Sequence, residues 1–269
     1  MIGAILLALT PAPVAAPAFH PIEGATYRSD TSETRTDDGG SQHFHASRRI
    51  VFRREATGYV AETTIDSADQ SGPQAGSAFL AGNRAFIGRL VRVHLDANGA
   101  ITAVDDADAL IERLATSIET AARTVTGPAR AAAMAAPLRA FDPAQRRAML
   151  GSAVADLIRP VDVARPDGTR TVALPSRVPT AAGQTLPGIE TVRRDGDAVS
   201  ITTHAAGPVT VGGTTVPGAA AGTITLDTLR RVDTTTGLVT ESRSARVITT
   251  ASGARSSRAE TVVTLRLEP

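Results

Sequence analysis

The spacing of apolar residues changes twice along this 269-residue chain, and this change constrains the fold more than any single motif. Thr- and Val-rich runs separated by turn residues fill residues 19–106 and 161–269, which is typical of antiparallel strands. Between them, residues 107–160 carry apolar side chains at helical spacing. We therefore predict an α+β fold, in which two or three amphipathic helices pack on a mainly antiparallel, half-barrel-like sheet. We expect the three blocks to form one compact domain.

Glycine-containing turns mark the predicted hairpins. Such turns supply the backbone conformations that short connections between antiparallel strands need. The clearest examples are Asp38-Gly39-Gly40, Asn98-Gly99, Asp195-Gly196 and Thr236-Gly237.

Two amphipathic helices are predicted in the central block. The first covers residues 106–124, and the second begins at Asp142, an N-cap residue followed by Pro143, and stops at Pro160. Residues 126–141 form either a further short helix or a connector. The apolar stripes of the two main helices contain Leu110, Leu114 and Ile118 in the first, and Leu150, Val154, Leu157 and Ile158 in the second.

The first 18 residues have the pattern of a secretory signal peptide. An apolar run from Ile2 to Leu9 is followed by prolines and then by small residues, with cleavage expected after Ala18 or after Ala16. A short N-terminal core helix is the alternative. The chain has no cysteine and no later apolar run near the roughly 20 residues of a membrane helix. We predict a periplasmic or secreted protein that is not an integral membrane protein.

Charge and aromatic content argue against nucleic-acid binding. The formal net charge is +1 and only 3% of residues are aromatic, with no tryptophan. Basic surfaces and stacking aromatic side chains are what nucleic-acid-binding proteins use. We therefore expect no nucleic-acid partner.

The stretch SQHFHASRRIVFRR, residues 41–54, raises the question of a metal site. In a strand, Phe44, Ala46, Ile50 and Phe52 would share a face with Arg48 and Arg54, while the two histidines would alternate with arginines on the other face. Neighbouring guanidinium groups disfavour a divalent cation. We predict no metal site and no cofactor, and expect His43, His45, His94 and His204 to face solvent.

Catalytic signatures are absent from the sequence. There is no G-x-S-x-G elbow, H-E-x-x-H pair, P-loop or dinucleotide-binding glycine motif. The acidic pair at Asp37 lies in a turn, and the cluster at residues 105–108 opens a helix, where acidic side chains favour the dipole. We therefore predict that the protein is not an enzyme and has no catalytic residue.

Several of these motifs carry a resemblance. The first strand near Gly24 with Tyr27, the run RLVRVHLDANGAITAV at 89–104 and the run LRRVDTTTGLVTESR at 229–243 together resemble an uncharacterised family of exported bacterial β-rich proteins, a domain of unknown function. The layout is more distantly similar to periplasmic lipoprotein carriers of the LolA and LolB type. That similarity implies a curved half-barrel that shelters acyl chains.

Three hypotheses for the function follow. The first is a binding or carrier protein that holds a lipid or other apolar small molecule against the concave sheet face. The second is an envelope structural or protein-interaction module with a filled core, which would contact an envelope protein through strands such as 238–249. The third is an enzyme with an unrecognised active site. Under the first, the predicted apolar lining consists of Phe44, Ile50, Phe52, Leu110, Leu114, Ile118, Leu150, Val154 and Leu157.

Overall fold

A single antiparallel sheet dominates the computed structural model, which describes residues 19–72, 78–176, 185–211, 220–250 and 256–269. The predicted signal peptide, residues 1–18, lies outside the described residues. In the described part, 11 strands pair in the order β5-β4-β3-β2-β1-β11-β10-β9-β8-β7-β6. The strands are β1 (Thr26–Asp37), β2 (Gly40–Glu55), β3 (Gly58–Ser71), β4 (Leu90–Asp96), β5 (Ile101–Val104), β6 (Gly168–Pro175), β7 (Thr185–Asp195), β8 (Ala198–Val211), β9 (Ala220–Asp233), β10 (Val239–Thr250) and β11 (Ser256–Leu267).

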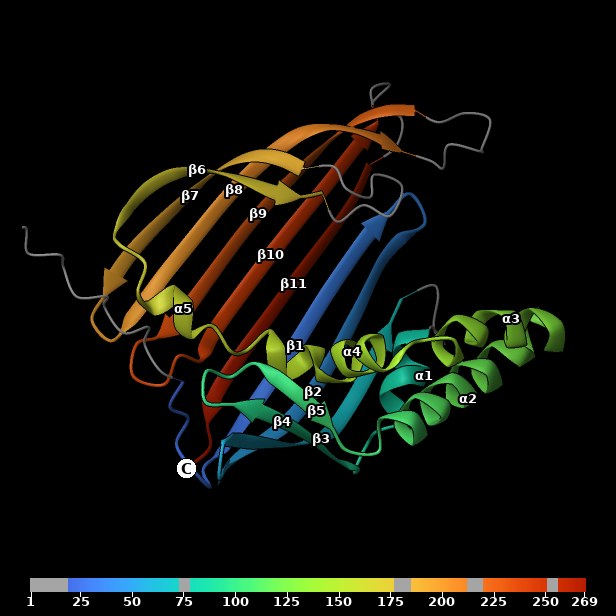
Figure 1. Ribbon diagram of the computed structural model, residues 1–269. Helices are drawn as coiled ribbons and strands as arrows, with labels where there is room; N and C mark the ends of the chain where they lie inside the picture. Colours follow the sequence, from blue (N-terminus) through green and yellow to red (C-terminus); the bar gives the residue numbers. More distant parts are fainter. Residues whose placement is uncertain (1–18, 73–77, 177–184, 212–219, 251–255) are drawn as a thin grey trace, which may run out of the picture.

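The sheet is curved and open, and its helices lie on the concave side (Figure 1). Its two halves, β1 to β5 and β6 to β11, are joined through the pairing of β1 with β11. The chain crosses from the β5 edge to the β6 edge through the helical block, so α4 and α5 lie across the concave face. The helices are α1 (Ala78–Arg84), α2 (Ala107–Thr126), α3 (Pro128–Arg139), α4 (Pro143–Ala155) and α5 (Pro160–Val163).

An aromatic cluster closes one end of the half-barrel. The ring of Phe19 makes edge contacts with Phe52 and Tyr59, at centroid distances of 5.6 and 5.3 Å, and Tyr27 lies 5.7 Å from Phe52. These rings are almost completely buried, together with Ile50 and Leu95. These edge-to-face contacts belong to the hydrophobic core that β1 to β4 share with the segment after α4.

The segment between α4 and α5 is fixed to the turn that joins β9 and β10. The amide of Val239 donates to the carbonyl of Leu157 at 2.8 Å, and the amide of Arg159 donates to the carbonyl of Gly237 at 3.0 Å. Gly237 has a φ of +72°, and a Cβ atom there would lie 3.1 Å from Pro160. This junction connects the helical block to the C-terminal half of the sheet.

The structure confirms the predicted α+β class, with the sheet half-open and the helices of the central block packed on it. Residues 126–141 form mainly α3, which settles the alternative between helix and connector. One helix, α1, lies within the block predicted to contain strands only. Its seven residues are too short a stretch for helical periodicity to stand out.

Two further expectations were wrong. The second predicted helix ends at Ala155 rather than at Pro160, and Pro160 starts α5 instead, because proline fits the first position of a helix. Leu157 and Ile158 therefore leave the helix and pack beside the β9–β10 turn, where Ile158 bridges to Leu238. Residues 239–250 form a central strand paired on both sides, so the backbone of β10 is not available for adding a partner strand.

Candidate functional site

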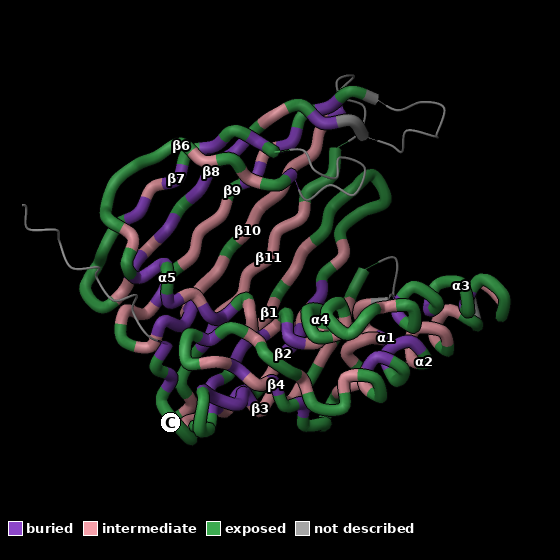
Figure 2. The backbone as a smooth tube through the Cα atoms, viewed as in Figure 1, coloured by how far each residue is buried: buried purple, intermediate pink, exposed green. Residues whose placement is uncertain are grey.

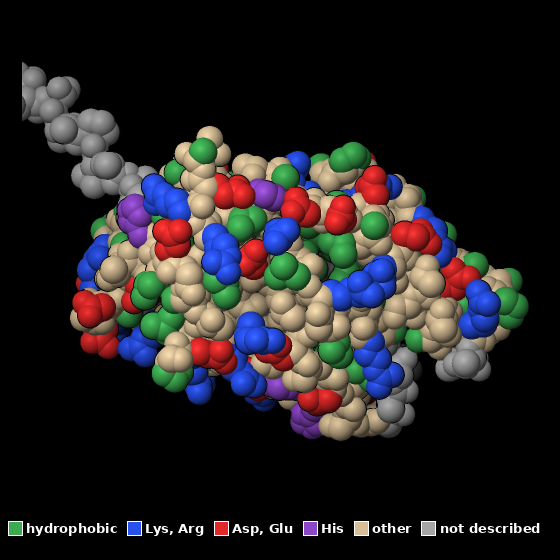
Figure 3. Space-filling model, turned by 90° about the horizontal axis from the view of Figure 1, so that it is seen from below, with side chains coloured by type: hydrophobic (Ala, Val, Ile, Leu, Met, Phe, Trp, Pro, Cys, Tyr) green, Lys and Arg blue, Asp and Glu red, His purple; other side chains and the backbone are tan. Residues whose placement is uncertain are grey.

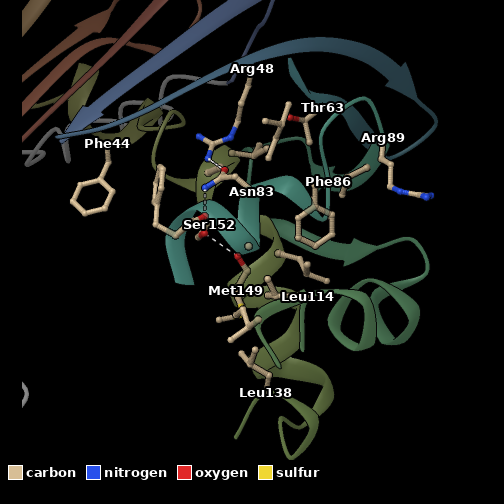
Figure 4. Close-up of a pocket in the computed structure, with 18 of the residues that line it drawn as sticks. Phe44, Arg48, Thr63, Asn83, Phe86, Arg89, Leu114, Leu138, Met149 and Ser152 are labelled. Atoms are coloured by element: carbon tan, nitrogen blue, oxygen red, sulfur yellow. Dashed lines mark hydrogen bonds between the residues drawn. The ribbon is translucent and has the colours of Figure 1, made fainter. Parts of the chain in front are cut away.

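A pocket of ≈ 730 Å³ lies between the inner face of β2 and β3 and the helices α1, α2 and α4 (Figure 4). It is partly open to solvent. Its walls are mostly apolar, and aromatic rings from β2 and α1 meet at its side, where Phe44 and Phe79 are 5.1 Å apart. The apolar lining consists of Phe44, Ile65, Phe79, Phe86, Val91, Leu114, Ile118, Leu138, Met149, Leu150, Ala153 and Val154.

Short-range contacts hold α1 over the sheet as one wall of this pocket. The hydroxyl of Ser117 on α2 donates to the carbonyl of Ala81 at 2.7 Å, and the amide of Gly88 donates to the carbonyl of Ile65 on β3 at 2.9 Å. A Cβ atom at Gly82 would lie 3.2 Å from Leu114, so a glycine allows α1 and α2 to approach closely. The result is a small helix fixed between β3 and α2.

The structure brings five of the nine predicted lining residues into this pocket. The other four, Ile50, Phe52, Leu110 and Leu157, pack into or against the closed aromatic core. Ile50 and Phe52 lie on the expected face of β2, but beyond the pocket and toward the closed end. Ligand binding by the remaining five stays a prediction: Phe44, Leu114, Ile118, Leu150 and Val154.

Every charged residue among the described residues that line the pocket is an arginine. Arg35 pairs with Glu33 at 2.5 Å and lies 5.0 Å over the ring of Phe44. Arg89 is exposed and, in Figure 4, points away from the other labelled side chains. Arg48 extends into the pocket, where Asn83 is its neighbour.

The environment of Arg48 is unusual for a cation. Its Nη2 donates to Oδ1 of Asn83 at 3.5 Å, the long limit for such a bond. Its partners across the strands are Ser29 on β1 and Ile65 on β3. Burial lowers the pKa of the Arg48 guanidinium below its ordinary value, because low-dielectric surroundings disfavour the charged form.

Two groups in the pocket were missed by sequence reasoning. Alternation along β2 placed Arg48 and Arg54 on the apolar face, but an arginine on such a face gave no reason to assign it a role. Phe79, Asn83 and Phe86 were missed because α1 was not predicted. The recurrence of aromatic residues in FLAGNRAF, residues 79–86, was the available signal.

A second charged cluster fixes α5 to the C-terminal half of the sheet. Asp162 is 1% exposed and pairs with Arg165 at 2.9 Å and with Arg230 at 2.8 Å. Glu190 on β7 is 8% exposed and pairs with Arg165 at 2.8 Å and with Arg170 at 2.5 Å. Since each buried carboxylate contacts two guanidinium groups, the cluster is electrostatically paired, as buried charges generally are.

The histidines form separate contacts on the sheet. His43 contacts the hydroxyl of Thr34, His45 lies 3.2 Å from Asp69 and 3.9 Å from Asp30, and His204 contacts Asp227. His94 lies between Asp105 at 2.9 Å and Glu55 at 3.1 Å, and these hydrogen bonds raise its pKa. In the part of the chain that the structure describes, no group of three His, Asp or Glu residues could hold a metal ion.

The face of the molecule in Figure 3 mixes basic and acidic side chains without a large patch of either sign. Surface ion pairs include those of Arg53 and Arg92 with Glu62. Among the helices in the described ranges, none combines the length and apolar character needed to cross a membrane.

Comparisons with known proteins do not assign this chain to a family. No family model matches the sequence, and no curated protein matches it. Two solved structures show weak likenesses. Rv2717c from M. tuberculosis is 11% identical, over 88% of this chain and 91% of that chain, with a TM-score of 0.26. A domain from Vibrio parahaemolyticus, named for outer membrane lipoprotein sorting, is 9% identical over 91% of this chain and 86% of that chain, with a TM-score of 0.19.

These likenesses are too weak to carry an argument about function. The weak structural neighbours include this lipoprotein-sorting domain, and the resemblance to LolA- and LolB-type carriers stays a prediction. The resemblance to an uncharacterised exported family stays a prediction, because neither sequence comparison supports it.

Proposed function

We propose that this protein is an exported, non-catalytic binding or carrier protein for a lipid or other apolar small molecule. The observation that carries this proposal is the ≈ 730 Å³ pocket lined mainly by apolar side chains. Protein interiors normally pack with few voids larger than a water molecule. The volume of this pocket also falls within the range of about 300–1,000 Å³ that is common for small-molecule sites.

The composition of the pocket supports binding rather than chemistry. Its polar lining consists of arginines, amides and hydroxyls, and no Asp, Glu or His is among the described lining residues. A general acid and base would ordinarily come from those residue types. Met149, which is 38% exposed, lines the pocket and provides a flexible, polarizable surface for an apolar guest.

Export is supported by the sequence of residues 1–18 alone, which lie outside the described residues. An exported protein with an apolar pocket would meet membrane-derived molecules in the same compartment. The proposal thus places the ligand and the protein on the outer side of the cytoplasmic membrane.

Binding of unbranched alcohols tests this function. We would measure how n-alkanols of increasing length displace the neutral fluorescent probe N-phenylnaphthylamine from the detergent-free protein. Because each buried methylene contributes about 0.8 kcal/mol, affinity should rise about fourfold per methylene until the pocket is full. An absence of saturable probe binding, or affinity that does not depend on chain length, would contradict the proposal.

A pocket-filling variant gives the matched comparison. Ala153 on α4 lines the pocket, whereas Ala148 on the same helix is exposed and does not. Ala153→Phe should lower alkanol affinity by about tenfold or more, since it occupies volume that the ligand needs. Ala148→Phe should leave the affinity unchanged, and equal losses in both variants would argue against this pocket as the site.

A further inference from the structure

We infer that the ligand of this pocket is an acidic amphiphile, whose monoanionic head group pairs with Arg48 while its apolar tail extends toward α2, α3 and α4. This inference rests on the proposed function and adds the chemical class of the ligand. The argument depends on the missing partner of Arg48, on the distribution of polarity along the pocket, and on the sign of its charges.

Among the residues that the structure describes, no carboxylate pairs with Arg48. Among the described residues its one side-chain hydrogen bond is the long contact to Asn83, a neutral amide. The segments outside the described residues contain no Asp or Glu at all. Arg48 is partly buried, and a guanidinium that is partly withdrawn from water without an anion costs the fold free energy. The lowered pKa of Arg48 has the same cause, and an anion supplied by a ligand would offset this cost.

Arg48 differs from the arginines of the cluster under α5 and from Arg35 in having no carboxylate partner among the described residues. In the cluster under α5, Arg165 and Arg230 contact Asp162 at 2.9 and 2.8 Å. Arg35, at the edge of the pocket, is paired with Glu33. The fold therefore supplies carboxylates for these arginines and supplies none for Arg48.

Arg48 and the aliphatic side chains of Leu114 and Leu138 lie at opposite ends of the pocket. Figure 4 shows Arg48 and Thr63 together near the sheet, with Asn83 beside Arg48, while Leu138 lies at the far end beyond Leu114. A molecule with one polar head and one apolar tail matches this distribution. A fully apolar molecule would leave the guanidinium without a partner, and a cationic head would be repelled by it.

The number of arginines available to the ligand indicates the charge of its head group. One planar guanidinium donates two parallel hydrogen bonds to a carboxylate or to a phosphate ester, and it neutralises one negative charge. Since Arg35 is already paired and Arg89 points away, a single negative charge suits the site best. The shared chemistry is an acidic oxyanion on an unbranched chain.

The test compares probes that share a tail and differ in the head. Tetradecanoate, tetradecanol, the monoanionic diester tetradecyl methyl phosphate and tetradecyltrimethylammonium would each displace N-phenylnaphthylamine, below their micelle-forming concentrations. Hydrogen bonds between a guanidinium and a carboxylate are stronger than hydrogen bonds to a neutral hydroxyl. Tetradecanoate should therefore bind about 10- to 100-fold more tightly than tetradecanol. The ammonium probe should bind more weakly than the alcohol. The ratio between phosphate and carboxylate distinguishes the two kinds of acidic head.

Variants assign the preference to Arg48. Arg48→Met should reduce the ratio between tetradecanoate and tetradecanol to about one while the alcohol still binds, and Arg48→Lys should keep part of the preference. Arg49 is the matched control, because it lies on the opposite face and pairs with Asp66 at 2.8 Å. Arg49→Gln should leave the ratio as in the wild type. Circular dichroism would verify that each variant is folded.

The outcomes separate this inference from the proposed function. If neither tetradecanol nor tetradecanoate binds, the proposed function fails and the inference fails with it. If both bind with equal affinity, and Arg48→Met changes neither, the pocket is an apolar-ligand site and the acidic head group is wrong. A preference for tetradecanoate that persists in Arg48→Met would also overturn the assignment to Arg48.

Discussion

The two halves of the sheet share one curvature and one continuous hydrogen-bond pattern, yet their inner faces differ. In the N-terminal half, strands β1 to β4 present aromatic and aliphatic side chains to the helices. In the C-terminal half, the inner faces of β9 and β10 carry Thr228, Ser242 and Ser244, and apolar clusters are small and separate. Figure 2 shows the difference as long stretches of intermediate burial in β10 and β11.

This contrast shows that curvature alone does not create an apolar site. The pocket forms where α1, α2 and α4 provide a second apolar layer opposite β2 and β3. In the other half, the short helix α5 is held by buried ion pairs, which satisfy charges rather than enclose apolar volume. The two regions should therefore respond differently to mutation.

The largest expected effect is a loss of folding stability that should occur in the N-terminal half of the sheet and not in the C-terminal half. Phe52→Ala should lower the free energy of unfolding by about 3–5 kcal/mol, since the ring is fully buried among Phe19 and Tyr27. Ser244→Ala, on the inner face of β10, should change it by less than about 0.5 kcal/mol. Urea unfolding followed by circular dichroism measures both. Equal losses would contradict the contrast between the halves.

The next effect tests whether the ion pairs under α5 are independent of the pocket. Asp162→Ala should lower the free energy of unfolding by about 3 kcal/mol, because it leaves Arg230 half-buried without its carboxylate and leaves Arg165 with Glu190 as its one carboxylate partner among the described residues. Asp156→Ala, at an exposed carboxylate, should cost less than about 0.5 kcal/mol. Tetradecanol affinity should stay unchanged in both variants. A large loss of binding in Asp162→Ala would show that the two regions are coupled.

A smaller effect concerns the helix that covers the pocket. The carboxylate of Asp142 accepts a hydrogen bond from the backbone amide of Gln145 at 2.8 Å, and the backbone amide of Asp142 donates to Oε1 of the Gln145 side chain at 3.0 Å. Asp142→Ala should destabilise the protein by about 1 kcal/mol, whereas Asp142→Ser should retain most of the cap. Thermal unfolding compares the two. Identical melting temperatures would mean that this cap contributes nothing.

The smallest expected effect is a pH dependence at His94. Hydrogen bonds to Asp105 and Glu55 raise its pKa in the folded state above the ordinary value of 6.5. The stabilisation is therefore complete below about pH 6.5 and is lost as pH rises through the raised pKa. The stability difference between wild type and His94→Gln should shrink over that interval. A difference that grows with pH would contradict the assignment.

The strand pattern and the turns could be read from the sequence because both follow local rules. Alternation along β2 placed Phe44 and Ile50 on one face, and Asp142 with Pro143 marked the start of α4. The position of the pocket along the sheet could not be read, because it depends on contacts between segments far apart in sequence. Phe52 and Phe44 share a face and have similar patterns, yet Phe19 covers the first and α1 lies against the second.

The sequence predicted the face on which Arg48 lies but not the groups that surround it. Its position on the apolar face followed from alternation, but its lack of a carboxylate depends on which residues of β1, β3 and α1 surround it. Pairing partners of a charged side chain are set by the tertiary structure, whereas its face is set by the strand.

Native mass spectrometry of the mature protein, purified without detergent and then extracted for lipid analysis, tests the central claim most directly. The account predicts a stoichiometric bound species that has an apolar chain and an acidic head, and that is lost in Ala153→Phe but kept in Ala148→Phe. A mass equal to that of the chain alone, together with no uptake of added tetradecanol, would contradict the claim that this pocket binds apolar ligands.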